Sequence, residues 1–515
     1  MGSRDSKIIS RSEAEARFPA NAYFCSMNAN PTFAIYTLGC KLNYSESSAI
    51  GQQLVKNGFT KVNFKEKADV YIINTCSVTN EADKECRMVV RNALNVSPEA
   101  FIAVIGCYAQ LKPEEIAKIE GVDVVLGASE KFNISKYLKK IEKNQFTEIH
   151  SCEIVGAQNF VPLPFHSSYS SGDRTRSFLK VQDGCDYSCS YCTIPLARGA
   201  SRSNTIENVV KDVYEIASKG VKEIVLTGVN LGDFGLSDRT RMTQIAYDQN
   251  DVKESESILN NPRHQRSNTH NESFFKLVQE LEKVNVSVRF RISSIEPNLL
   301  TDDIIKFIST SEKFVPHFHI PLQSGSNAIL KAMRRRYLRE LYVERVALIK
   351  SLMPHCCIGA DVISGFPGET EELFLETYNF LNELDVSYLH AFTYSERSNT
   401  LAAESKDVVP MDVRKKRTRM LRILSEKKLR QFYTNNLGQE KPVLFEGHIN
   451  DGWQYGHTDN YVRVRIPSDK ILKNSMYMVR LNAINEEGTV DGEIVRAQNI
   501  EPLHEAYNLS LTTYH

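Results

Sequence analysis

The chain has 515 residues, of which 63 are basic and 63 acidic, so its formal net charge at pH 7 is zero. Hydrophobic residues make up 42% and charged residues 24%, ordinary proportions for a folded protein that exclude a largely disordered chain. The length predicts several domains, and the even charge means that any nucleic acid must bind to local basic clusters rather than to the protein as a whole.

The first 30 residues lack the apolar core of a signal peptide, and the chain contains no run of 18 apolar residues. We therefore expect a cytoplasmic protein without a membrane span, with residues 1–30 as a disordered leader. In a reducing cytosol, the 11 cysteines indicate metal binding or catalysis rather than disulfides.

From residue 31 to 150, short apolar runs alternate with helical patterns. This alternation predicts a parallel sheet flanked by helices, an N-terminal α/β domain. Residues 151–175 have loop composition and are interpreted as a linker. The predicted strands lie in TFAIYTL, VYIIN, FIAVIG and VDVVLG.

A second alternation covers residues 176–433 and predicts another α/β domain. Its strand candidates, each followed by a helical stretch, favour a partial (βα)6 barrel with an active site at the carboxyl ends of the strands. Residues 236–272 are polar and aperiodic, which indicates a surface insertion. The six strand candidates are SFLKVQ, EIVLTG, RFRISSI, HFHIPL, IGADVISG and YLHAFTYS.

The C-terminal part combines a basic helix with a small β domain. The pattern of residues 414–430 predicts a helix that holds nine basic residues and one acidic residue. Residues 438–503 contain short β-rich runs and turn residues, which predicts a small β-barrel. We expect RNA to contact the helix and the aromatic residues of the barrel, Trp453, Tyr455 and Tyr461, although basic helical faces are often merely solvated.

Three cysteines, Cys185, Cys189 and Cys192, form a C-x3-C-x2-C pattern in the loop after the first barrel strand. Three thiolates in one loop suit an iron–sulfur cluster or zinc, and the loop itself offers no fourth ligand. An open coordination position at the catalytic end of a barrel indicates chemistry. The alternative is a structural zinc site that a distant histidine, such as His166 or His317, completes.

Three further cysteines, Cys40, Cys76 and Cys107, each follow one of the first three predicted strands of the N-terminal sheet. The carboxyl ends of parallel strands meet at one edge of a sheet, which is where such sheets bind ligands. We therefore predict a second three-thiolate site. The alternative is that these cysteines are small buried apolar residues without a ligand.

These patterns resemble a known family. The Cys185–Cys192 loop, with Tyr191 before its last cysteine, resembles the signature of radical S-adenosylmethionine enzymes. The order of a three-cysteine domain, a barrel and a small β domain resembles the methylthiotransferases of that superfamily, over residues from about 32 to 500. The C-terminal segment resembles the TRAM module, an RNA-binding barrel.

The resemblance implies two 4Fe-4S clusters and S-adenosylmethionine as cofactors. Cys185, Cys189 and Cys192 would hold the cluster whose fourth iron binds S-adenosylmethionine, and the other three cysteines would hold an auxiliary cluster that carries the sulfur. In such enzymes an electron donor such as flavodoxin or ferredoxin starts a radical reaction, and a second S-adenosylmethionine supplies the methyl group. We expect a monomer.

Finer strings resemble the branch that methylthiolates carbon 2 of N6-threonylcarbamoyladenosine at position 37, in the anticodon stem-loop of tRNA. Two alternative substrates remain open, an aspartate of a ribosomal protein and isopentenyladenosine in tRNA. A further alternative is a zinc-stabilised RNA-binding adaptor without enzymatic activity. The strings are NTCSVTNEADKECR, LTGVNLGDFG, RISSIEP, HFHIPLQSGS and MRRRY.

Other residues at the predicted strand ends are candidates for binding S-adenosylmethionine. Arg334, in MRRRY, suits the methionine carboxylate because a guanidinium binds carboxylates in a bidentate manner. Gly365, the first glycine of GFPGET, permits close approach of the backbone to the adenine. Each has an alternative as a cap, a turn or a solvated face. The candidates are Tyr191, Thr227, Gly228, Asn230, Glu296, Gln323, Arg334 and Gly365.

Overall fold

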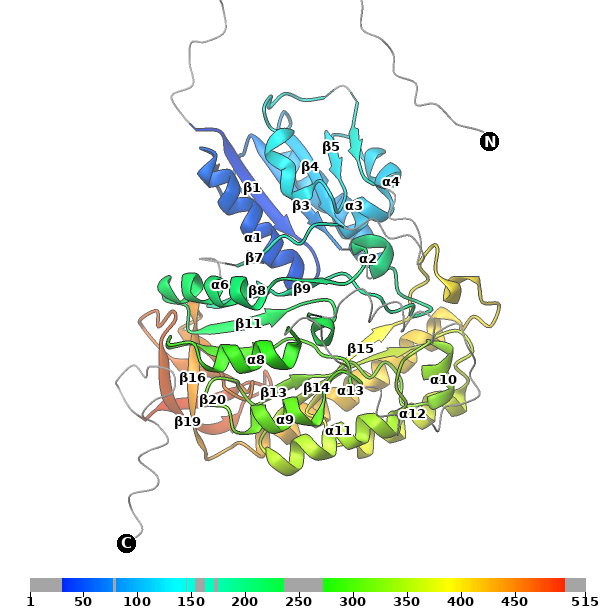
Figure 1. Ribbon diagram of the computed structural model, residues 1–515, viewed down its shortest axis with the longest axis vertical. Coiled ribbons are helices and arrows are strands. Elements are labelled where there is room, and N and C mark those ends of the chain that lie inside the picture. Colours follow the sequence, from blue (N-terminus) through cyan, green and yellow to red (C-terminus); the bar gives the residue numbers. More distant parts are fainter. Residues whose placement is uncertain are drawn as a thin grey trace, which may run out of the picture.

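The computed structural model describes residues 30–76, 80–144, 146–152, 163–170, 175–235 and 272–495. The predicted leader, most of the predicted linker and the predicted insertion up to residue 271 lie outside the described residues. An N-terminal sheet domain sits on a larger barrel, and a small C-terminal barrel adjoins that larger barrel (Figure 1). Among the described residues, no helix is long and apolar enough to cross a membrane.

The N-terminal domain is a parallel sheet with the strand order β2-β1-β3-β4-β5-β6, as the alternating pattern predicts. Its central strands β3 and β4 are buried along their whole length, because helices cover both faces of the sheet. The strands are β1 (Thr32–Thr37), β2 (Thr60–Lys61), β3 (Val70–Thr75), β4 (Phe101–Gly106), β5 (Val124–Leu126) and β6 (Glu148–His150).

Hydrophobic side chains of α1 and η1 pack on one face of this sheet, and those of α2, α3 and α4 pack on the other. Because β1, β3 and β4 are neighbours in the sheet, the loops that follow them lie at one edge. These helices are α1 (Lys41–Lys56), α2 (Asn80–Val96), α3 (Cys107–Leu111), α4 (Pro113–Ala117) and η1 (Lys131–Lys136).

The six predicted strands of the second domain are confirmed. They form two sheets, β12-β11-β8-β7 and β13-β14-β15, which a parallel bridge between Phe290 and Phe314 joins into one curved wall. Only β7 (Ser168–Tyr169) is antiparallel to its neighbour. The parallel strands are β8 (Arg176–Lys180), β11 (Glu223–Thr227), β12 (Arg289–Ile292), β13 (His317–His319), β14 (Cys357–Ser364) and β15 (Tyr388–Thr393).

Helices cover the outside of this wall, and a single large hydrophobic core fills the space between helices and strands. Thr205, Ser273, Thr301 and Thr370 each begin a helix, and each side chain accepts a hydrogen bond from a first-turn N–H. The helices are α6 (Ile206–Ser218), α8 (Phe274–Glu282), α9 (Asp302–Ser309), α10 (Asn327–Ala332), α11 (Arg339–Leu352) and α12 (Glu371–Glu383).

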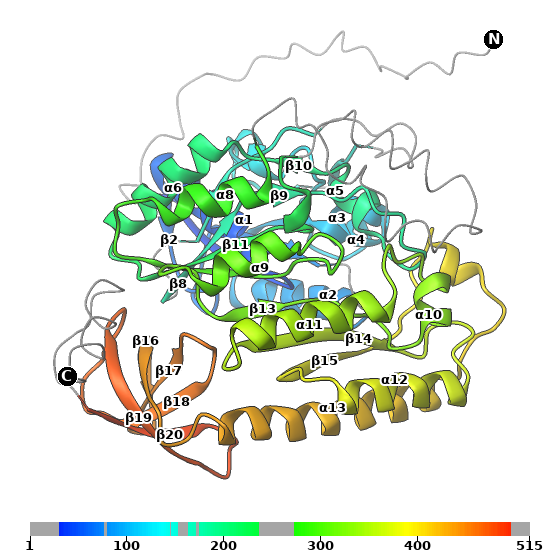
Figure 2. The ribbon, with the colours of Figure 1, turned by 60° about the horizontal axis from the view of Figure 1, so that its bottom comes forward.

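The predicted basic helix is α13 (Met411–Thr434), which packs on β15 and β14 and leads to the C-terminal barrel (Figure 2). This barrel closes in the order β16-β17-β18-β20-β19. The strands are β16 (Glu440–Asn450), β17 (Trp453–Thr458), β18 (Arg463–Pro467), β19 (Met476–Ile484) and β20 (Val490–Ile494).

The C-terminal barrel docks at the amino ends of the larger barrel's strands. The buried carboxylate of Glu223 accepts hydrogen bonds from Arg289 and Arg291, and each arginine also donates to a backbone carbonyl of the small barrel, at 3.3 and 3.1 Å. Tyr461 packs against His317 with ring centroids 4.7 Å apart. Tyr461 therefore belongs to this domain contact, which corrects its assignment to RNA.

Two of the nine basic residues of α13 are buried. Arg414 is buried and donates to the carbonyl oxygens of Val409 and Tyr394, at 2.6 and 3.1 Å. Arg417 is also buried and donates to the carboxylate of Glu369 at 2.8 Å. A buried guanidinium needs such partners, so these side chains fix the helix to the barrel instead of binding RNA.

Gly365 explains why this helix can lie so close. Its φ is +78°, and a Cβ there would lie 2.2 Å from Cγ of Arg414. The glycine therefore makes room for Arg414, which differs from the predicted role of bringing backbone to an adenine.

We predict that Gly365→Ala destabilises the protein more than Gly368→Ala. Both glycines have positive φ, at +78° and +82°, so both variants lose roughly 1–2 kcal/mol through backbone strain. Only Gly365→Ala adds a clash, which costs roughly 1–3 kcal/mol more, because nothing lies within 4 Å of a Cβ at Gly368. Chemical denaturation measures the difference, and equal losses would contradict the packing role.

Candidate active site

The structure brings the three N-terminal cysteines to one edge of the sheet. Cys40 is the residue before α1, Cys76 directly follows β3, and Cys107 directly follows β4 as the first residue of α3. The loop after β1 crosses closely over Cys76, because a Cβ on Gly39 would lie 2.7 Å from the Cys76 sulfur.

Asn43, which the sequence interpretation missed, ties these loops together. Its Nδ2 donates to the carbonyl oxygens of Leu38 and Thr75, at 2.8 and 3.0 Å, next to Cys40 and Cys76. Its carbonyl oxygen accepts a hydrogen bond from Nδ2 of Asn74 at 3.0 Å. The side chain of Asn43 thereby fixes the ends of two strands that carry candidate ligands.

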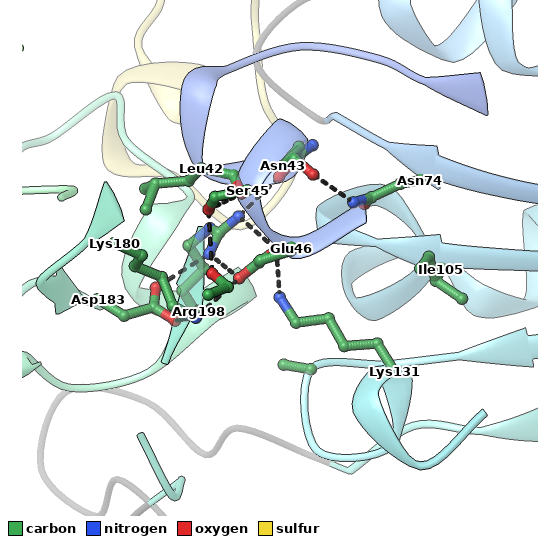
Figure 3. A network of polar contacts seen from close by, with 12 residues as sticks. Leu42, Asn43, Ser45, Glu46, Asn74, Ile105, Lys131, Lys180, Asp183 and Arg198 are labelled. Atoms are coloured by element: carbon green, nitrogen blue, oxygen red, sulfur yellow. Dashed lines mark hydrogen bonds and ion pairs between the residues drawn. The ribbon is translucent and has the colours of Figure 1, made fainter. Parts of the chain in front are cut away.

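A buried ionic network joins this edge to the barrel (Figure 3). Glu46, on α1, is fully buried and pairs with Lys131 at 2.7 Å, with Arg198 at 3.0 Å and with Lys180 at 3.2 Å. Arg198 also donates to Oδ1 of Asn43 at 2.7 Å. Burial alone would raise the pKa of Glu46, but the surrounding cations hold it well below its ordinary value.

Asp183 extends this network to the second cysteine loop. Its carboxylate pairs with Arg198 at 2.9 Å and Arg202 at 2.8 Å, and it accepts a hydrogen bond from the N–H of Gly184 at 2.9 Å. Asp183 directly precedes the motif that begins with Gly184, and Arg198 ends the helix that follows it. One arginine therefore contacts residues that position both cysteine sites.

The charges around the N-terminal cysteines fit a thiolate-bound cluster. The network holds four cationic side chains, those of Lys131, Lys180, Arg198 and Arg202, and two carboxylates, those of Glu46 and Asp183, which leaves two positive charges in excess. Burial raises the pKa of Cys107, and the nearby Arg198 and Lys131 counteract this effect. Thiolates that bind iron would meet this excess positive charge.

The second cysteine loop lies between β9 (Gln182–Asp183) and α5 (Ile194–Arg198). Gly184 has a φ of +71°, and a Cβ there would lie 2.0 Å from the carbonyl oxygen of Ala200. The N–H of Cys185 donates to the carbonyl oxygen of Gly199 at 3.1 Å. The motif thus needs its leading glycine to fold back against the end of α5.

The three thiols of this loop share a protein-enclosed environment. Burial raises the pKa of Cys185 and Cys189, and it raises that of Cys192 to about 12. Free thiols are therefore protonated here, and iron binding would displace their protons. Arg335 donates to the sulfur of Cys189 at 3.2 Å, which suits a thiolate with a negative charge.

Arg335 replaces Arg334 as the basic residue at this loop. Arg334 is exposed and has a φ of +55°, where the chain turns after α10. The next residue, Arg335, is directed inward, contacts the hydroxyl of Tyr191 at 3.5 Å and forms an ion pair with Glu296. Arg334 is therefore not the arginine that contacts this loop, and Glu296 has the ion-pair role that was its alternative.

A cavity of about 250 Å³ opens beside Cys192. Its walls include the predicted residues Tyr191 and Gln323, together with Asp361 of β14. Two further wall residues, Tyr394 and Ser395, have buried hydroxyl oxygens without a hydrogen-bond partner among the described residues. Unsatisfied buried hydroxyls next to an open cavity fit a polar ligand such as S-adenosylmethionine.

Three predicted residues, Thr227, Gly228 and Asn230, lie next to the strand that leads into the cysteine loop. Thr227 donates to the carbonyl oxygen of Leu179, and a Cβ on Gly228 would lie 2.9 Å from Oε1 of Gln182. The same Gln182 oxygen accepts from the N–H of Asn230 at 2.8 Å, and its Nε2 donates to the carbonyl of Gly184. The side chain of Gln182 therefore connects the backbone of Asn230 to the cysteine loop. Oδ1 of Asn230 has no hydrogen-bond partner among the described residues.

The zinc alternative has little support in this geometry. His166 stacks on Phe132, and His317 packs on Tyr461 at the amino end of the barrel, opposite the cysteine loop. Four sulfurs around zinc lie roughly 3.8 Å apart, because Zn–S bonds are about 2.3 Å long. Among the described residues, neither cysteine trio has its sulfurs all within 4.8 Å of one another. A polynuclear cluster accommodates wider spacing.

Fold and site together define a class of protein, a barrel enzyme with three cysteines in one loop of the barrel and three more at the edge of a separate sheet domain. The sequence profile of "Radical SAM superfamily" matches residues 179–381, and that of "Uncharacterized protein family UPF0004" matches residues 32–127.

Curated relatives cover most of the chain. The Bacillus subtilis protein named "Threonylcarbamoyladenosine tRNA methylthiotransferase MtaB" is 38% identical over 84% of this chain and 90% of its own. A Thermotoga maritima protein of the same name is 33% identical over 89% and 96%. A Clostridium botulinum "tRNA-2-methylthio-N(6)-dimethylallyladenosine synthase" is 30% identical over 94% and 97%. The chain belongs to the radical S-adenosylmethionine methylthiotransferase family.

Solved structures are more distant. The radical S-adenosylmethionine methyltransferase TsrM from Kitasatospora setae, with cobalamin and a [4Fe-4S] cluster bound, aligns with a TM-score of 0.47 at 12% identity, over 73% of this chain and 77% of that chain.

We predict that Arg198→Met destabilises the protein by roughly 3–5 kcal/mol, because it leaves Glu46 and Asp183 buried with fewer partners. Chemical denaturation and iron per chain are the measurements. Lys219→Met is the control, since it removes an exposed pair with Glu215 that contributes at most about 1 kcal/mol. A loss in Arg198→Met no larger than in this control would show that the network is not structural.

Proposed function

We propose that this protein transfers a methylthio group to carbon 2 of N6-threonylcarbamoyladenosine at position 37 of tRNA. The observation that carries the proposal is the pair of three-cysteine sites, which Asn43, Arg198 and Asp183 connect through one chain of buried contacts. Sulfur insertion needs a radical-forming site and a sulfur-carrying site in a fixed relation. The relatives of highest identity named above act, by their names, on this nucleoside.

The proposed ligands follow from the geometry. Cys185, Cys189 and Cys192 would hold the radical-forming 4Fe-4S cluster, and Cys40, Cys76 and Cys107 would hold the auxiliary one. When bound, these groups and S-adenosylmethionine supply the 5′-deoxyadenosyl radical, the sulfur and the methyl group.

The chain's own contribution is to position these groups and to exclude water. The cavity beside Cys192 would take S-adenosylmethionine, with the hydroxyls of Tyr394 and Ser395 as polar contacts and Gln323 on the opposite strand end. Arg335 contacts the sulfur of Cys189, so its positive charge would stabilise the anionic cluster.

The tRNA would contact the outward face of α13 and the surface of the C-terminal barrel, which we propose to be TRAM-like. Two arginines of β18 lie over aromatic rings of β17, with Arg465 4.2 Å from the ring of Trp453 and Arg463 5.0 Å from that of Tyr455. Such pairs suit phosphates and unstacked bases. The exposed basic residues of α13 are Lys415, Lys416, Arg419, Arg422, Lys427 and Arg430.

The setting of this reaction completes the proposal. We propose a monomer that acts in the cytoplasm, where its tRNA substrate is found. A small electron-transfer protein such as flavodoxin or ferredoxin would deliver the electron.

Reconstitution tests the proposal. We expect the iron-loaded protein, given S-adenosylmethionine and a reductant, to convert N6-threonylcarbamoyladenosine in tRNA into its 2-methylthio form, as nucleoside mass spectrometry detects. Conversion of isopentenyladenosine tRNA or of a ribosomal protein instead would overturn the substrate assignment. A colourless zinc protein without iron would overturn the enzymatic function.

Two matched triple variants separate the cysteine sites. Changing Cys185, Cys189 and Cys192 to Ala should leave about half the iron and abolish cleavage of S-adenosylmethionine, since one of two clusters is lost. Changing Cys40, Cys76 and Cys107 to Ala should also leave about half the iron, retain cleavage and abolish methylthiolation. Retained cleavage in the first variant contradicts the assignment.

A further inference from the structure

Members of this family act on adenosines that differ in charge. The dimethylallyl group named for the Clostridium botulinum relative is neutral and apolar, whereas a threonylcarbamoyl group carries a carboxylate and a hydroxyl. An enzyme that accepts the charged group needs a cation and a polar partner where the modified base enters, because an unpaired buried carboxylate is costly.

Lys41 is a cationic residue at this position. It is the first residue of α1 and directly follows Cys40. Its side chain is exposed and has no hydrogen bond or ion pair with any described residue. It interacts electrostatically with Asp361, Arg176 and Arg291, which belong to three strands of the barrel. The side chain of Lys41 therefore lies near these barrel strands, although it belongs to the N-terminal domain.

The neighbouring arginines are already engaged. Arg291 forms two hydrogen bonds with the carboxylate of Glu223, at 2.9 and 3.2 Å, and Arg176 lies 3.9 Å from the same carboxylate. The sulfur of Cys40 would be occupied by iron under the proposed function. Lys41 is thus the cation in this group that is available for a ligand.

A polar trio is built around Asp361, the acidic residue of the barrel with which Lys41 interacts. His319 of β13 and His390 of β15 both contact Oδ1 of Asp361 on β14, the strand between them, at 2.9 and 3.2 Å. Asp361 also lines the cavity beside Cys192. Asp361 thus relates the trio to the proposed site of S-adenosylmethionine, whose wall it forms, and to Lys41, with which it interacts electrostatically.

Asp361 determines which ring nitrogen of His390 can accept a hydrogen bond from a ligand. Burial alone would raise the pKa of Asp361, but hydrogen bonds from His319 and His390 hold it well below its ordinary value, so the carboxylate is ionised. An ionised carboxylate only accepts hydrogen bonds, so Nδ1 of His390 carries the proton. The side chain of His390 is exposed, and in the neutral ring Nε2 is then a hydrogen-bond acceptor.

We propose that Lys41 and His390 form the subsite that recognises the threonylcarbamoyl group of the substrate. The ammonium of Lys41 binds the carboxylate, and Nε2 of His390 accepts a hydrogen bond from the threonyl hydroxyl. His319 and Asp361 are positioning residues that orient the ring of His390. This subsite rests on the proposed function, and it places the adenine between the cavity beside Cys192 and the auxiliary cysteines.

The test of Lys41 compares two anticodon stem-loop RNAs, one with N6-threonylcarbamoyladenosine and one with its neutral methyl ester. We expect the wild type to prefer the carboxylate substrate by roughly 10- to 100-fold in kcat/KM, the effect of one charge-assisted hydrogen bond. In Lys41→Met this preference should fall to about twofold or less. Lys56→Met, at the exposed far end of the same helix, should keep it.

The outcomes separate the two proposals. A wild type that does not convert the threonylcarbamoyl RNA overturns the proposed function itself. A wild type that converts it, together with a Lys41→Met variant that retains the full preference, overturns only the role of Lys41. Iron per chain is measured in each variant, and the ratio of two substrates on one preparation is unaffected by the fraction of active protein.

The test of His390 uses an RNA with a glycylcarbamoyl group, which keeps the carboxylate and lacks the hydroxyl. We expect the wild type to prefer the threonyl substrate by roughly 5- to 10-fold, and His390→Phe to lose this preference.

One ring nitrogen each of His319 and His390 and one carboxylate oxygen of Asp361 lie within 4.8 Å of one another, a spacing that would also suit a metal ion. A stoichiometric divalent metal, other than cluster iron, that His390→Phe loses would overturn direct recognition of the hydroxyl.

Discussion

The geometry of both cysteine sites depends on the guanidinium of Arg198. It pairs with Glu46 of the N-terminal domain and with Asp183 of the barrel, and it donates to Asn43 between the auxiliary cysteine loops. These charged groups are buried, so water cannot solvate a charge that loses its partner. The ion pairs are therefore stable only as a complete set. The two domains are thereby held in one relative placement, which a reaction between two clusters requires.

The two ends of the larger barrel differ: the C-terminal barrel covers the amino ends of its strands, and the candidate site lies at their carboxyl ends. At the amino ends of its strands, Glu223 and its arginines bind the backbone of the C-terminal barrel, and Tyr461 covers His317. The carboxyl ends carry the Cys185–Cys192 loop and the adjoining cavity. The N-terminal domain contributes Cys40, Cys76 and Cys107, so under the proposed function the space where the substrate base reacts would be built by two domains.

Sequence patterns predicted what depends on local periodicity and spacing. Four strands of the first domain, six of the second, the basic helix and the grouping of Cys40, Cys76 and Cys107 at one sheet edge follow from alternation and strand order, whereas the short strands β2, β6 and β7 were not predicted. Side-chain direction was less predictable. In MRRRY, a backbone turn at Arg334 directs the next residue, Arg335, to the cluster loop. Gly365 proved to accommodate Arg414, a contact between residues far apart in the chain.

The sequence by itself determined the chemistry, because three thiols within eight residues, and one thiol after each of three strands, limit the ligands that can bind. The tertiary structure alone decided how the sites are connected. Glu46, Arg198 and Lys41 are ordinary charged residues in ordinary helices, and no spacing marks them. They gain their roles only where α1 meets the barrel, since burial and opposing charge arise from packing and not from neighbours in the chain.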